Sequence, residues 1–139
     1  MKLFFFILFT VSPVFLIGQA EILGTWKTID DVDGQASSHV KFESRDGKIY
    51  GKVVKLLEVA DDVVCELCEG EKKNQPVLGL EIVTDMKKSG NSYKGGRILD
   101  PENGKTYKCR MKLVDGVLEV RGYIGFVALG RTQKWYRVE

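Results

Sequence analysis

The residues with the clearest capacity for chemistry are three cysteines. Cys65 and Cys68 form a C-x-x-C pair, and Cys109 lies much further along the chain. In an exported protein such thiols usually form a disulfide, and an odd number leaves one of them free. A bond from the pair to Cys109 would close a loop of about 40 residues and stabilise the fold by roughly 4 kcal/mol, whereas a bond within the pair would clamp only its own loop. Spacing does not choose between these pairings, so all three cysteines are disulfide candidates.

The C-x-x-C pair is also the pattern of redox sites and of some zinc sites. Redox exchange needs a stabilised thiolate, and the acidic residues on both sides of the motif disfavour one. These residues are Asp61, Asp62, Glu69 and Glu71. Zinc would need a fourth ligand, and the single histidine, His39, alternates with Val40 and Phe42 and therefore points outward. A thiol–disulfide redox protein remains an alternative function, and we predict no metal site.

Other catalytic patterns do not fit the chain. The acidic run at residues 30–34 has Val40 where an EF-hand needs its bidentate glutamate, so a polar turn explains the run better. Ser37 and Ser38, the hydroxyls nearest the histidine, lack a nucleophile-elbow context, and no phosphate-loop motif occurs. We predict no catalytic residue and no cofactor, and we favour a protein that is not an enzyme.

Residues 1–20 have the pattern of a signal peptide. Lys2 is followed by an apolar run that contains Pro13, and Gly18 and Ala20 occupy the positions that signal peptidase reads. The run is shorter than the roughly 20 apolar residues of a membrane-spanning helix. We expect cleavage after Ala20, export to the periplasm or beyond, and no membrane anchor in the mature chain.

The mature chain, residues 21–139, is one domain in length and nearly neutral in charge. Without Lys2, the 21 basic residues fall to 20, against 19 acidic ones. This balance gives no reason to expect nucleic acid or an anionic membrane as a partner, and it favours a mixed, solvated surface.

Turn signals divide the mature chain into short strands. Asp-Gly or Asn-Gly pairs, which favour tight hairpins, occur at residues 33–34, 46–47, 103–104 and 115–116. The stretches between them alternate apolar and polar residues, and long helical periodicity is absent. We predict an all-β fold: a single antiparallel up-and-down β-barrel of about eight strands, because closure removes exposed sheet edges.

Two of these turns predict strand register. If residues 115–116 form a two-residue turn, the core face receives four cross-strand pairs: Leu113 with Leu118, Met111 with Val120, Cys109 with Gly122, and Tyr107 with Ile124. A turn at residues 46–47 likewise places Phe42 over Gly51 and Val40 over Val53, and a glycine leaves room for the aromatic ring.

Two resemblances follow from short motifs. Gly24-Thr25-Trp26 resembles the G-x-W signature of lipocalin and avidin-like barrels, which implies that Trp26 closes one barrel end and that Arg137 of the last strand packs across its ring. More closely, the mature chain resembles the exported bacterial family known as domain of unknown function 2147. The segments that carry this resemblance are 24–28 with 30–31, 47–53, 65–68 with Gly70, 95–101 with 104–107, 120–125, and 129–133 with Trp135. The resemblance implies a small lipocalin-like barrel in the bacterial envelope and no agreed catalytic role.

Aromatic residues are the best candidates for contact with a ligand. The predicted ligand-binding residues are Trp26, Tyr50, Tyr123, Phe126 and Trp135. The apolar residues 126–129 form a candidate loop at the mouth of the barrel. We therefore predict a non-enzymatic binding module for a small apolar or amphipathic ligand or a peptide. A structural or partner-binding envelope protein with a filled barrel is the further alternative, and the interior volume separates the two.

Overall fold

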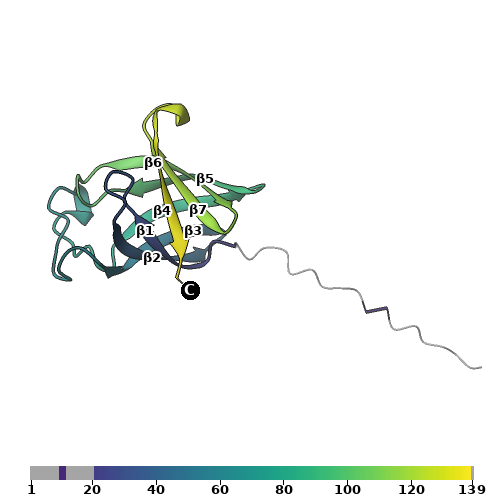
Figure 1. The fold of residues 1–139 in the computed structure, drawn as a ribbon, viewed down its shortest axis with the longest axis horizontal. Coiled ribbons are helices and arrows are strands. Elements are labelled where there is room, and N and C mark those ends of the chain that lie inside the picture. Colours follow the sequence, from purple (N-terminus) through teal and green to yellow (C-terminus); the bar gives the residue numbers. More distant parts are fainter. Residues whose placement is uncertain (1–9, 12–20, 139) are drawn as a thin grey trace, which may run out of the picture.

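The structure is a computed structural model that describes residues 10–11 and 21–138, so the predicted signal-peptide cleavage lies outside the described residues. Eight antiparallel strands form a closed barrel in which each strand pairs with the next and β1 pairs with β8 (Figure 1). The strands are β1 (Gly24–Ile29), β2 (Ala36–Arg45), β3 (Lys48–Leu56), β4 (Glu81–Ser89), β5 (Ser92–Leu99), β6 (Thr106–Val114), β7 (Val117–Tyr123) and β8 (Arg131–Arg137). Two short 3-10 helices, η1 (Gly70–Lys72) and η2 (Val127–Leu129), lie in connections. The predicted all-β up-and-down barrel is confirmed.

Hairpin turns set the register as the sequence predicts. Asp46 and Gly47 have φ values of 52° and 77°, and Asp115 and Gly116 have 51° and 79°, the left-handed conformation of tight hairpin turns. The predicted core-face pairs of both hairpins are observed, with one exception. The predicted pair between Tyr107 and Ile124 is wrong, because β7 ends at Tyr123 before the ladder reaches that position.

One end of the barrel is filled by side chains. Trp26 is fully buried, and its indole N–H donates a hydrogen bond to the carbonyl oxygen of Ile22 at 2.8 Å. The guanidinium carbon of Arg137 lies 4.4 Å from the centre of the Trp26 ring. The Arg137 side chain also donates to the carbonyl oxygens of Leu23, at 2.9 Å, and Glu21. The N-terminal segment of the domain is thereby held across this end.

Four connections surround the opposite end. They are the segments 30–35, 57–80, 100–105 and 124–130, which join β1 to β2, β3 to β4, β5 to β6 and β7 to β8. The longest, 57–80, contains η1 and an isolated bridge between Val64 and Pro76. The 100–105 turn packs tightly against it, because a Cβ at Gly104 would lie 1.9 Å from the carbonyl oxygen of Leu67. No helix among the described residues is long and apolar enough to cross a membrane.

Candidate functional site

An open cavity of about 520 Å³ lies between these four connections and runs into the barrel. Its inner wall is apolar and includes the buried side chains of Val53, Ile82, Leu99 and Val120. The volume falls within the range of small-molecule binding sites. The barrel is thus filled at one end and open at the other, where the cavity extends from the connections to the apolar inner wall.

Trp135 forms part of the inner wall and is held rigidly. Its side chain is only 1% exposed, and its ring stacks on Phe42 with 6.0 Å between ring centres and 25° between planes. The indole N–H donates to the side-chain oxygen of Gln133 at 3.0 Å. A ligand in the cavity would therefore lie beside a fixed indole ring whose fluorescence can report its arrival.

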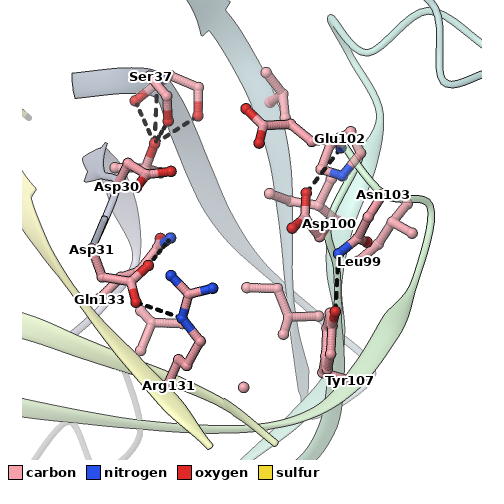
Figure 2. A pocket seen from close by; sticks show the side chains of 18 of the residues that line it. Asp30, Asp31, Ser37, Leu99, Asp100, Glu102, Asn103, Tyr107, Arg131 and Gln133 are labelled. Carbon is pink, nitrogen blue, oxygen red and sulfur yellow. Dashed lines mark hydrogen bonds and ion pairs between the residues drawn. The ribbon is translucent and has the colours of Figure 1, made fainter. Parts of the chain in front are cut away.

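The mouth of the cavity is rich in carboxylates. Figure 2 shows Asp30 and Asp31 on one side of the cavity and Asp100 and Glu102 on the other. Glu58 also lines the cavity, so three separate connections contribute acidic side chains.

Arg131 is the basic residue of the cavity lining. Its Nε donates to an Asp31 carboxylate oxygen at 2.8 Å, and the Gln133 amide donates to the other oxygen at 3.4 Å. Figure 2 shows the Arg131 side chain pointing into the middle of the cavity. Of the five carboxylates that line the cavity, only that of Asp31 is thus paired with the Arg131 guanidinium.

Burial and repulsion between carboxylates act together on the pKa of Glu102. Partial burial raises the pKa of Glu102, and the nearby charges of Asp100, Asp30, Glu58 and Asp33 raise it further. For Asp31, partial burial opposes ionisation, but hydrogen bonds from Arg131 and Gln133 outweigh it and lower the pKa. The mouth therefore carries an excess of negative charge around Glu102 that a positively charged group would relieve.

A hydroxyl cluster adds a neutral polar patch to the wall. The Thr28 Oγ1 lies 2.8 Å from the Ser37 Oγ and 2.9 Å from the Ser38 Oγ, and all three residues line the cavity. Register explains the cluster, because Thr28 of β1 pairs with Ser38 of β2. These hydroxyls satisfy one another, so an apolar ligand would leave none of them without a hydrogen bond.

The segment 124–130 forms an apolar edge of the mouth and is braced by Arg121. The Arg121 guanidinium donates to the carbonyl oxygens of Val127, at 2.7 Å, and Ala128, at 3.3 Å. Ile124 and Leu129 line the cavity and are 66% and 74% exposed. This segment corresponds to the predicted mouth loop.

The five aromatic residues expected to contact a ligand separate into two groups. Tyr123 and Trp135 line the cavity, whereas Trp26 lies at the filled end. Tyr50 lies outside the barrel, where its hydroxyl donates to Asp85 at 2.8 Å and Arg45 stacks on its ring at 3.9 Å. Phe126 is 77% exposed beside the mouth and is not part of the lining.

The structure also selects one cysteine pairing. Cys65 and Cys68 form a disulfide within the 57–80 connection, and Cys109 is a buried free thiol. Burial raises the pKa of Cys109 to about 12, so this thiol stays protonated and unreactive at neutral pH. Across residues 10–11 and 21–138, no three His, Cys, Asp or Glu side chains are grouped closely enough to hold a metal ion.

Comparisons with known proteins agree with this architecture. The family described as "Uncharacterized protein conserved in bacteria (DUF2147)" matches residues 24–137. Among solved structures the chain is similar to protein HP1028 from the human pathogen Helicobacter pylori, described as belonging to the lipocalin family. The two share 25% sequence identity and a TM-score of 0.76, over 87% of this chain and 85% of the other. No curated protein matches the chain. A lipocalin-like barrel with an open cavity suggests a module that binds small ligands.

Proposed function

We propose that this chain, which belongs to the DUF2147 family, is a non-enzymatic binding protein of the bacterial envelope that takes one small amphipathic molecule into its barrel. The observation that carries the proposal is the cavity of about 520 Å³, apolar inside and polar at its mouth. Such a gradient orients an amphipathic ligand with its apolar part inward, because burying apolar surface is favourable and burying an unpaired polar head is costly.

The negative charge of the mouth indicates which head group the ligand should carry. Five carboxylates and one guanidinium line the cavity, and that guanidinium is already engaged by Asp31. An anionic head would add to the repulsion around Glu102, whereas a cationic head would lower it. We therefore expect amphiphiles with a cationic head to bind better than anionic amphiphiles that have the same apolar chain.

A matched pair of detergents tests both parts of the proposal. Dodecyltrimethylammonium and dodecyl sulfate carry the same chain and opposite head charges, and both are titrated below their micelle-forming concentrations. Trp135 in the cavity wall is the reporter, and the Trp26→Phe variant removes the other tryptophan of the chain from the signal. We expect a saturable fluorescence change with dodecyltrimethylammonium, and at least tenfold weaker binding of dodecyl sulfate.

Two variants separate binding in the cavity from binding elsewhere. Val120→Phe adds bulk to the apolar wall and should weaken binding of the cationic detergent severalfold. Lys55→Ala, on an exposed part of β3, should leave its affinity unchanged. A protein that shows no saturable change with either detergent would refute the proposed function, and equal affinity for the two would refute only the charge preference.

A further inference from the structure

The outer surface of β4, β5 and β6 carries a dense group of basic side chains. We call this group the basic wall, and its members are Lys87, Lys94, Arg97, Lys108, Arg110 and Lys112. All are exposed except Arg110, which is partly buried. The near-neutral total charge thus conceals local groups of one sign, with carboxylates at the mouth and these six cations on the outer surface of three neighbouring strands.

Strand register places these cations directly opposite one another. Lys87 pairs with Lys94 across β4 and β5, and Arg97 pairs with Lys108 across β5 and β6. Arg110 pairs with Arg121 across β6 and β7. Like charges in directly opposed positions destabilise a sheet.

The chain itself supplies little compensation for this repulsion. Throughout residues 21–138, no carboxylate lies within salt-bridge distance of any member of the basic wall. Glu119 pairs in the ladder with Lys112 and places one acid at the edge of the group. An external anionic surface would relieve the repulsion that the fold leaves in place.

An exposed apolar segment adjoins the basic wall. Lys108 lies opposite Tyr123, the last residue of β7, and the segment 124–130 follows directly. Figure 1 shows this segment projecting from the barrel beyond β6. Phe126 is 77% exposed and Leu129 is 74% exposed, and Arg121 holds the segment in place through the carbonyl oxygen of Val127.

We propose that the basic wall and the apolar side chains of Phe126 and Leu129 dock this protein on the surface of an anionic lipid bilayer. The cations cover three neighbouring strands and so form a two-dimensional array, which matches a sheet of headgroups better than a single linear polyanion. A bilayer also accepts exposed Phe and Leu side chains at the headgroup boundary, which an acidic polymer does not. Each Lys or Arg near such a surface strengthens binding about fivefold.

Vesicle co-sedimentation of the mature protein tests this docking. Vesicles of pure phosphatidylcholine are compared with vesicles that contain one-third phosphatidylglycerol, at low and at physiological salt. We expect binding only to the anionic vesicles, with weakening as salt is added. Lys94→Glu/Lys108→Glu should reduce binding at least tenfold, and Phe126→Ser/Leu129→Ser should reduce it severalfold at unchanged salt dependence.

The matched control reverses two charges elsewhere on the barrel. Lys52 and Lys55 are exposed on β3, and Lys52→Glu/Lys55→Glu makes the same change in net charge. An equal loss of binding in this control would show a net-charge effect and would overturn the proposal. So would binding to soluble polyphosphate without binding to anionic vesicles. Detergent binding in the cavity, read from Trp135, should be unchanged in Lys94→Glu/Lys108→Glu, whose two positions lie outside the cavity lining, so a failure of docking is distinct from a failure of the proposed function.

Discussion

The filled end of the barrel offers the sharpest test of how the fold is held. Arg137 packs over the Trp26 ring and donates hydrogen bonds to the carbonyl oxygens of Leu23 and Glu21. The Arg137→Gln substitution keeps a polar side chain, shorter than that of arginine, but removes the charge and the stacking. It should therefore release the segment that precedes β1 from the last strand.

The structure sets the size of this effect. A charge-assisted hydrogen bond contributes about 1.5–3 kcal/mol, and a cation–π contact at an exposed position contributes about 0.5–1 kcal/mol. Because the guanidinium is exposed, solvent screening reduces the sum of these contributions, and we expect Arg137→Gln to lower the free energy of unfolding by about 2–3 kcal/mol. The measurement is urea unfolding followed by far-ultraviolet circular dichroism.

A second arginine is the control for this prediction. Arg131 likewise lies on β8, but it makes its ion pair with Asp31 at the open mouth, where solvent weakens the interaction. Arg131→Gln should leave stability almost unchanged and alter detergent affinity instead, whereas Arg137→Gln should do the reverse. If Arg137→Gln costs less than about 0.5 kcal/mol, or no more than Arg131→Gln, the account of the filled end is wrong.

Three further predictions concern single positions. Gly96→Ala should destabilise the barrel by about 3 kcal/mol, because the new Cβ would lie 2.1 Å from the carbonyl oxygen of Thr84; a loss below about 1 kcal/mol in urea unfolding would contradict this. The raised pKa of Glu102 means that folding favours its protonated form, so the wild type should gain stability as pH falls through that raised value towards 4.5. Glu102→Gln should accordingly stabilise the protein at neutral pH and lose this advantage in acid, and a destabilised variant at neutral pH would refute the sign. Cys109, with its pKa raised to about 12, should resist iodoacetamide in the native protein and react in guanidinium, as intact mass would show; rapid native alkylation would contradict its burial.

Local signals were enough to predict the strands. The Asp-Gly turns at residues 46–47 and 115–116 set left-handed backbone conformations that tie neighbouring strands in one register, and alternation then assigned each residue to a face. The same register also determines on which face of the sheet Tyr50 lies. Its neighbours Ile49 and Gly51 face the core, so Tyr50 must face outward, away from the cavity.

The cavity and its acidic mouth depend on information that no single segment contains. Asp31 and Glu102 belong to turns far apart in the sequence, and each turn alone resembles an ordinary polar loop. Only closure of the barrel brings both to one opening. The hollow interior has the same origin, because it reflects how all the inward side chains fill the space that eight strands enclose.

The separation of charge was hidden for a related reason. Composition alone indicated a mixed surface, since 20 basic and 19 acidic residues of the mature chain nearly cancel. Cross-strand pairing of Arg97 with Lys108 and of Lys87 with Lys94 gathers cations on one wall. The sequence predicted these strands only approximately and did not predict the register between them. That register is what shows the cations to be neighbours.

We have proposed that the open cavity takes one amphipathic molecule with its apolar part inward. Isothermal titration of the mature protein with dodecyltrimethylammonium, repeated at several temperatures, tests it most directly. We expect one molecule bound per protein and a negative heat-capacity change, because apolar surface leaves water as the alkyl chain enters the cavity of about 520 Å³. Binding of many molecules per protein, or of one molecule without a heat-capacity change, would contradict it.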